Sequence, residues 1–171
     1  RLESLTETIN SDFHDIEEVL RGVWIARLSS EQIREFVSGY GEIWSAQFLC
    51  AHLDAAGASA DWLDARRVLT VESGARAVAV DWALSRERLG EWQAKEEGAQ
   101  IVVITGYVAS TPDGIATTLK RNGSDFSASI FGALLEADSI TIWTDVDGVM
   151  SADPRRVPDA VVIPELSYQE A

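Results

Sequence analysis

The stretch IVVITGYVASTPDGIATTLKRNGSDFSASIFGALLEADSITIW, residues 101–143, decides the fold class. It opens with a continuous apolar run over 101–109, which is typical of a strand buried on both faces of a sheet. The turn STPDG follows, and then a short strand, a glycine loop, a helix predicted over 124–137 and a second buried strand predicted over 139–143. Strand, helix and strand at this spacing predict parallel crossover units, and therefore an α/β fold with helices on both faces of the sheet.

The first part of the chain predicts mainly helices. Apolar residues recur at helical spacing over 2–25, and Ser30 is a suitable N-cap for a helix that runs through Val37. Gly39 and Gly41 are expected to break this helical pattern. The other predicted elements are an apolar helical stripe that ends at Gly57, an extended segment over 61–71 and a helix over 81–94.

Composition excludes several classes of protein. The chain has 171 residues, 46% hydrophobic and 25% charged, without repeats or linkers, which predicts one globular domain. Its net charge of −14 argues against a nucleic-acid partner, because Lys and Arg patches bind phosphate backbones. One cysteine, Cys50, rules out an internal disulfide and favours a reducing, cytoplasmic compartment. No apolar run is long enough to span a membrane, and we expect no membrane partner.

The segment LKRNGSDFSA is the first candidate site. Its polar residues lie between a predicted strand and the N-terminus of a helix, where open α/β sheets bind ligands. Gly123 allows close approach of a ligand to the backbone, and Arg121 can grip a carboxylate or phosphate with two hydrogen bonds. The alternative is a simple N-cap, in which Ser124 or Asp125 bonds the first helical turn. The sequence of this segment alone leaves both open.

The segment ITIWTDVDGVMSADPRRV, residues 140–157, is the second candidate site. Thr144 and Asp145 follow the predicted strand directly, and Arg155 comes after a turn. Three interpretations share these carboxylates: a phosphatase nucleophile, a calcium loop and a nucleotide pocket. The calcium-loop interpretation fails, because that loop needs glycine at its sixth position and glutamate at its twelfth. Counted from Asp145, the glycine is fourth and the twelfth residue is an arginine. The phosphatase interpretation rests on a resemblance of D-x-D-G-V after a hydrophobic strand to the first motif of the haloacid-dehalogenase superfamily. It fits poorly, because that superfamily requires a lysine further along the chain and the tail 148–171 contains none.

The segment GYGEIWS is the third candidate site. Glu42 and Ser45 are predicted to begin a helix. A glutamate at this position can interact favourably with the positive end of the helix dipole, or it can bind a substrate ammonium group. The two histidines, His14 and His52, have no partners at ligand spacing, so we predict no metal-ligating residues.

Together these segments resemble the aspartokinases, which have the amino acid kinase fold. GYGEIWSAQFL, TTLKRNGSDFSA and WTDVDGVMSADPRRV are similar to three ordered motifs of that family, and SADWLDARRVL and ITGYVASTPDG are similar more loosely. The resemblance runs from about residue 16 to 171, and it is greatest to the kinase part of bifunctional aspartokinase–homoserine dehydrogenases. It implies a largely parallel, open, twisted sheet with helices on both faces. Residues 1–171 would then be a partial catalytic domain that lacks the family's first strand and C-terminal end.

The resemblance also implies an activity. Aspartokinases phosphorylate the side-chain carboxylate of L-aspartate with ATP and Mg²⁺, giving 4-phospho-L-aspartate for lysine, threonine and methionine synthesis. L-aspartate and ATP are therefore the expected partners, and a homo-oligomer is expected for the full-length enzyme. Carried over by position, the catalytic residues are Arg121 and Asp125; the substrate-binding residues are Glu42 (ammonium), Arg121 (carboxylate), Ser45, Asn122, Gly123 and Ser124; and the ATP-binding residues are Thr144, Asp145, Met150 and Arg155.

The chemistry of phosphoryl transfer agrees with these residue types, because it needs alignment and charge neutralisation more than a protein base. Two family lysines, in the opening strand KFGGTS and a later GAK segment, are absent. Losing both predicts a rate lower by on the order of 10⁴–10⁶, so we expect this chain alone to be nearly inactive. Two alternatives remain open: a kinase of the same fold for another amino acid, and a non-catalytic fragment or assembly module.

Overall fold

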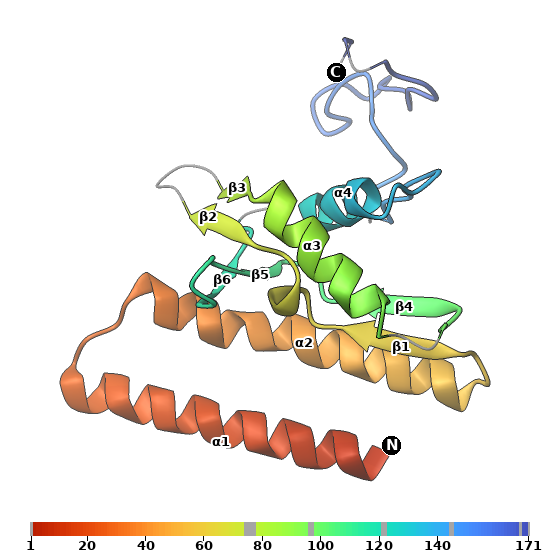
Figure 1. The fold of residues 1–171 in the computed structure, drawn as a ribbon. Coiled ribbons are helices and arrows are strands. Elements are labelled where there is room, and N and C mark those ends of the chain that lie inside the picture. The colour runs from red at the N-terminus through yellow and green to blue at the C-terminus, as the bar shows by residue number, and fades with distance from the viewer. Residues whose placement is uncertain are drawn as a thin grey trace. The chain divides into compact units, whose positions relative to one another are not determined.

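The computed structural model forms two compact units, Arg1–Ile140 and Thr141–Ala171, which we describe separately (Figure 1). The described residues are 2–73, 78–95, 98–120, 123–143, 146–167 and 169–170. The sequence-based expectation of one partial catalytic domain stays a prediction.

Two long helices, α1 (Leu2–Ala26) and α2 (Glu31–Ala55), form one side of the first unit (Figure 1). The predicted N-cap of α2 is confirmed, since Ser30 Oγ accepts a hydrogen bond of 3.2 Å from the Ile33 N–H. The predicted break at Gly39 and Gly41 is wrong, because α2 runs through both glycines.

Packing explains why α2 continues through Gly39. A Cβ at this position would lie only 2.9 Å from Val108 Cγ1, so the missing side chain allows the helix to approach the strands closely. A Cβ at Gly41 would have no heavy atom within 4 Å. Each glycine disfavours the helix by about 0.5–1 kcal/mol, and the buried side chains of Tyr40 and Ile43 on the same helix offset that cost.

The strands form three pairs. β1 (Ala60–Leu63) and β4 (Ile101–Ile104) pair in parallel, with Ala60 opposite Ile101 and Leu63 opposite Ile104. The two other pairs are antiparallel: β2 (Val71–Ser73) with β3 (Val78–Val80), and β5 (Val108–Ser110) with β6 (Ala116–Thr118). A parallel bridge between Thr70 and Ser110 connects the last two pairs.

The apolar run 101–109 is divided between two strands, β4 and β5, contrary to the single strand predicted. Tyr107 takes a left-handed backbone conformation with φ of 67°, which turns the chain between them. The prediction that both faces of this strand are buried is wrong for β4, since Ile101 and Val102 are 39% and 38% exposed. The reason is that β4 pairs with β1 alone among the described strands.

The segment 61–71 is extended only in part. The short 3₁₀ helix η1 (Ala65–Arg67) interrupts it, and Asp64 caps that helix by accepting a 3.0 Å hydrogen bond from the Arg66 N–H. The Asp64 carboxylate also pairs with the Arg66 guanidinium at 2.6 Å. Burial alone would lower the pKa of Arg66, but the hydrogen bond and charge of Asp64 raise it.

Two helices, α3 (Trp82–Gln93) and α4 (Gly123–Leu134), lie on the other side of the strands (Figure 1). Both were predicted from the sequence, and α3 lies within the predicted range 81–94, with Asp81 as its N-cap. α4 ends earlier than predicted because Glu136 adopts a left-handed φ of 52° and the Ala137 N–H bonds back to the Gly132 carbonyl at 2.9 Å. The α/β class with helices on both faces is confirmed.

The strand predicted over 139–143 is absent from the described structure, since these residues join no strand pair. Ile140, Ile142 and Trp143 are 47%, 45% and 90% exposed. An apolar sequence forms a strand only where a neighbouring strand can bond its N–H and C=O groups. The described residues do not provide one here.

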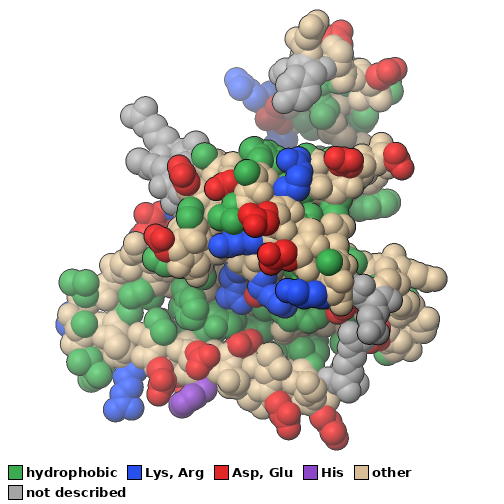
Figure 2. Space-filling model, viewed as in Figure 1, with side chains coloured by type: hydrophobic (Ala, Val, Ile, Leu, Met, Phe, Trp, Pro, Cys, Tyr) green, Lys and Arg blue, Asp and Glu red, His purple; other side chains and the backbone are tan. Residues whose placement is uncertain are grey.

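The helices α1 and α2 are joined by aromatic contacts and one long-range hydrogen bond. The ring centroids of Phe13 and Trp44 lie 4.6 Å apart, and Trp44 Nε1 donates to Asp12 Oδ2 at 2.9 Å. Figure 2 shows hydrophobic side chains at the C-terminal end of α1. Trp24 near this end and Leu28, two residues beyond it, are 65% and 71% exposed.

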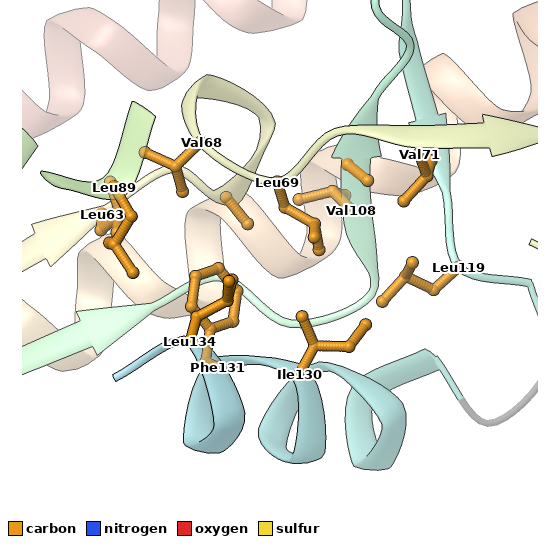
Figure 3. Close-up of a cluster of buried hydrophobic side chains, with 12 residues drawn as sticks. Leu63, Val68, Leu69, Val71, Leu89, Val108, Leu119, Ile130, Phe131 and Leu134 are labelled. Carbon is orange, nitrogen blue, oxygen red and sulfur yellow. The ribbon is translucent and has the colours of Figure 1, made fainter. Parts of the chain in front are cut away.

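The main hydrophobic core lies between the strands, α3 and α4 (Figure 3). Side chains of α4 point toward those of β2, of β5 and of Leu69, which follows η1, and each of these contributes at least one fully buried side chain. This core fixes α4 against the strand ends. Its largest members are Leu63, Val68, Leu69, Val71, Leu89, Val108, Leu119, Ile130, Phe131 and Leu134.

The second unit contains one short antiparallel contact. Met150 and Val162 form a bridge, and it is flanked by hydrogen bonds of 2.8 Å from the Ser151 N–H to the Val161 carbonyl and from the Ile163 N–H to the Val149 carbonyl.

We expect alanine substitutions at the two glycines of α2 to act in opposite directions. Gly41→Ala should raise the free energy of unfolding by about 0.5–1 kcal/mol, because alanine loses less backbone freedom than glycine in a helix. Gly39→Ala should lower it by about 1–3 kcal/mol, because its methyl group would overpack against Val108. Urea denaturation of the two variants measures both. Equal stabilisation by both substitutions would show that Gly39 is not needed for the close approach.

Candidate functional site

The candidate site lies where the chain leaves β4 and where α4 begins. Gly106 lies directly against Ser124, since a Cβ on Gly106 would be 3.5 Å from the Cα, Cβ and Oγ atoms of Ser124. The carboxyl end of a strand therefore meets the N-terminus of a helix, which is the usual position of a ligand site in open α/β sheets.

The hydroxyl of Ser127 holds these two segments together. Its Oγ accepts a hydrogen bond from the Tyr107 N–H and donates one to the Gly123 carbonyl, both at 2.8 Å. Ser127 is only 4% exposed, so solvent does not compete with these bonds. The Tyr107 carbonyl in turn accepts from the Leu119 N–H at 2.7 Å, which links this turn to the end of β6.

Two non-glycine residues at the site have left-handed backbones. Tyr107 and Lys120 have φ values of 67° and 64°, and each lies next to a strand end. This conformation costs of order 1–3 kcal/mol per residue and persists only where the surrounding structure holds it. The Lys120 carbonyl accepts a 3.1 Å hydrogen bond from the N–H of Gly123, the first residue of α4.

The first turn of α4 contains three of the predicted site residues. Gly123 is buried, and a Cβ there would lie 2.7 Å from Tyr107 Cδ2, so glycine is required for the turn to close. Ser124 and Asp125 are exposed. The free N–H groups and positive dipole end of a helix N-terminus favour an anionic ligand. Arg121 and Asn122 lie outside the described residues.

An open hollow of about 290 Å³ adjoins this turn. Its polar lining comes from Thr105, Ser124 and Ser127, and its apolar lining includes Ile104 and Phe131. Thr105 Oγ1 already accepts a 2.7 Å hydrogen bond from the Ala65 N–H. Ser124 therefore offers the exposed hydroxyl in this hollow, whose size is at the lower end of the range for small-molecule sites.

Glu42 and Ser45 lie in the middle of α2, not at a helix start as predicted. The dipole explanation for Glu42 therefore fails. Glu42 is partly buried, and burial raises the pKa of its carboxyl group. Among the described residues it has no ion-pair partner, so a cationic ligand group would relieve its desolvation. Ser45 is exposed.

The predicted ATP-binding residues belong to the second unit. Thr144 and Asp145 lie outside the described residues. Met150 is partly buried in its bridge with Val162, and Arg155 is exposed, with its N–H bonded to Asp153 Oδ1 at 2.9 Å. We therefore describe these residues apart from the helix α4 site.

Two residues of the site were missed by sequence reasoning. Ser127 lies four residues after Gly123, about one helical turn. This spacing could have predicted that its hydroxyl donates to the Gly123 carbonyl. Glu35 binds Lys120 across the site from α2, and no local pattern in the sequence indicates that contact. Among the described residues, no group of three His, Cys, Asp or Glu side chains could hold a metal ion. The described helices also include no candidate for a membrane span.

Comparison with known proteins gives consistent matches. Residues 5–171 match the amino acid kinase family. The chloroplastic bifunctional aspartokinase/homoserine dehydrogenase 1 of Zea mays is 48% identical over 95% of this chain, and that of Arabidopsis thaliana is 47% identical over 99%. The chain spans only 18% and 19% of these relatives.

A solved structure, Escherichia coli aspartokinase III in complex with aspartate and ADP (R-state), is similar with a TM-score of 0.73 and 26% sequence identity. The match covers 95% of this chain and 40% of that one. This likeness confirms the fold that was predicted from the three motifs.

We expect Glu42→Gln to stabilise the folded protein at neutral pH. A carboxyl group whose pKa is raised on folding stabilises the fold below its unfolded pKa of 4.5, and this contribution is lost as the pH rises through the folded value. The glutamine variant has no charge to bury, so its melting temperature should exceed that of the wild type at pH 7, and the difference should disappear near pH 4.

Glu31→Gln is the matched control on the same helix. Hydrogen bonding and charge of Lys120 lower the pKa of Glu31, so this substitution should not stabilise the protein at pH 7. A melting temperature of Glu42→Gln at or below the wild-type value at pH 7 would contradict the prediction.

Proposed function

The chain belongs to the amino acid kinase family, and on that premise we propose that it is part of an aspartate kinase. The enzyme would transfer the γ-phosphoryl group of ATP to the side-chain carboxylate of L-aspartate. The observation that carries the proposal is the locked turn of Gly106 and Tyr107 against Ser124 at the start of α4. It occurs in a chain whose relatives are named as aspartokinases, one solved with aspartate and ADP.

The proposed reaction requires no protein base. A side-chain carboxylate oxygen of aspartate attacks the γ-phosphorus of ATP, the bond from that phosphorus to the bridging oxygen of ADP breaks, and 4-phospho-L-aspartate and ADP form. The attacking carboxylate is already ionised at neutral pH, so no proton has to be removed. The site must align two anions and compensate their charge.

The residues of the first unit would bind the amino acid. The N-terminus of α4, with Gly123 and the exposed hydroxyl of Ser124, suits a substrate carboxylate. Arg121 would clamp a carboxylate with two hydrogen bonds. Glu42, which burial disfavours as an anion, would regain a partner in the substrate ammonium. Asn122 and Ser45 complete the proposed substrate residues.

The nucleotide residues of the proposal are Thr144, Asp145, Met150 and Arg155. Asp125 would organise the reacting groups at the helix start, where its exposed side chain is open to a ligand. Mg²⁺ would supply neutralisation of the phosphate charge, and it usually needs only one or two protein carboxylates beside substrate phosphates.

The wider setting is also a proposal. Such an enzyme would begin the synthesis of lysine, threonine and methionine from aspartate, and the full-length protein would be a homo-oligomer. The single cysteine favours a reducing compartment such as the cytoplasm, and the plant relatives are described as chloroplastic.

We expect the full-length protein to form ADP in a reaction that depends on L-aspartate, with much lower rates for L-glutamate and N-acetyl-L-glutamate. Arg121→Ala should lower kcat/KM for aspartate by about 100-fold, because a charge-assisted hydrogen-bond pair to the substrate is lost. Coupled measurement of ADP release gives both constants.

Arg86→Ala is the matched control, since it removes an exposed arginine on α3, a helix that contributes none of the proposed site residues. Its kcat/KM should stay within about twofold of the wild type, as expected for an exposed charge. Preference for either glutamate substrate would assign the chain to another kinase of the same fold. Absence of saturable nucleotide binding would favour a non-catalytic module.

A further inference from the structure

Glu35 of α2 holds a polar contact that the proposed site residues do not include. Its Oε1 pairs with the Lys120 ammonium, and its Oε2 accepts a 2.7 Å hydrogen bond from Thr117 Oγ1. Both carboxylate oxygens of Glu35 are therefore engaged by residues more than eighty positions away in the chain. The contact connects the first turns of α2 with the end of β6 and the turn that precedes α4.

Glu35 differs from the second carboxylate at this cluster. Glu31 also contacts Lys120 Nζ, at 2.9 Å, but its side chain is 69% exposed, whereas that of Glu35 is 11% exposed. Exposed ion pairs are worth about 0–1 kcal/mol, and removing one partner of a buried pair costs considerably more. Glu35 is therefore the carboxylate that holds Lys120.

The backbone of Lys120 carries this restraint to α4. Lys120 is one of the two residues at the site in the left-handed conformation, with φ of 64°. Its carbonyl accepts the 3.1 Å hydrogen bond from the Gly123 N–H, which is the first residue of α4. A strained backbone needs an external restraint, and the ion pair with Glu35 supplies one through the side chain of the same residue.

We propose that Glu35 is a positioning residue for the substrate site, acting through Lys120 to fix the start of α4. This inference rests on the proposed function, which places substrate-binding groups at Gly123, Ser124 and Asp125. Glu35 itself does not touch the substrate. Lys120, whose charge is compensated by Glu31 and Glu35, serves as the connecting residue and not as a phosphate ligand.

The alternative is an ion pair that only stabilises the packing of α2 on β6. Such a pair would change the fraction of folded enzyme, and therefore the apparent kcat, without a specific effect on KM. A positioning residue instead changes the affinity for the substrate in molecules that remain folded. The split between KM and kcat therefore separates the two roles.

The experiment uses the full-length protein with Glu35→Gln, Lys120→Met and the double variant, and Glu31→Gln as the matched control. The first readout is KM and kcat for L-aspartate. The second is amide hydrogen exchange of residues 123–126, which reports the stability of the start of α4 whether or not aspartate is the substrate.

We expect Glu35→Gln to raise KM for aspartate by about five- to tenfold, with kcat within about twofold. Exchange of residues 123–126 should become faster by about tenfold. In the Lys120→Met background, Glu35→Gln should have no additional effect on either readout, because its route to α4 is already lost. Glu31→Gln should stay within about twofold of the wild type in both.

Unchanged exchange at 123–126 in Glu35→Gln, or additive effects in the double variant, would overturn the inference. A lower kcat with unchanged KM would assign Glu35 a purely structural role. A wild-type protein without aspartate-dependent turnover would instead overturn the proposed function, and the exchange measurements alone would then decide whether Glu35 positions α4.

Discussion

The buried hydroxyl of Ser127 is the contact on which the rest of the site depends. It bonds both the N–H that follows β4 and the carbonyl that opens α4, so the strand end and the helix start cannot move independently. Gly123 makes this possible, because a Cβ at this position would lie only 2.7 Å from Tyr107 Cδ2. The same hydroxyl bonds the N–H of Tyr107, one of the two left-handed residues at the site. The main core beneath α4 keeps the helix in place (Figure 3).

The charge distribution limits how this acidic chain could bind the anionic substrates proposed for it. The net charge is −14, and on the face drawn in Figure 2 Lys and Arg side chains lie among Asp and Glu side chains. Attraction of a polyanion by the overall field is therefore unfavourable, unlike at a nucleic-acid surface. Binding of the proposed anionic substrates would therefore depend on donors at short range: helix N–H groups, a hydroxyl and the proposed arginine. Lys120 would add little to such binding, because ion pairs with Glu31 and Glu35 already compensate the charge of its ammonium group.

Local patterns predicted the helices well and the long-range contacts poorly. The N-cap Ser30 follows from sequence, because a cap is a bond between near neighbours. The break at Gly39 was wrong because a strand residue, Val108, determines what that glycine does. The apolar segment 139–143 lacked a described partner strand, which no local pattern can supply. Ser127 was within reach of sequence reasoning, whereas Glu35 was not, since its partner lies 85 residues away.

The wide sequence separation of the site's contacts has a consequence for the order of folding. The helices α1 and α2 are built from local hydrogen bonds and can form before the chain is closed into a globule. The bond from Ala65 to Thr105 spans 40 residues, and the pair of Lys120 with Glu35 spans 85. Closing such loops loses chain entropy before any contact compensates it. We therefore expect the site to assemble late, after the core beneath α4 has formed. A chain whose core is still incomplete would then contain helices but no formed site for a ligand.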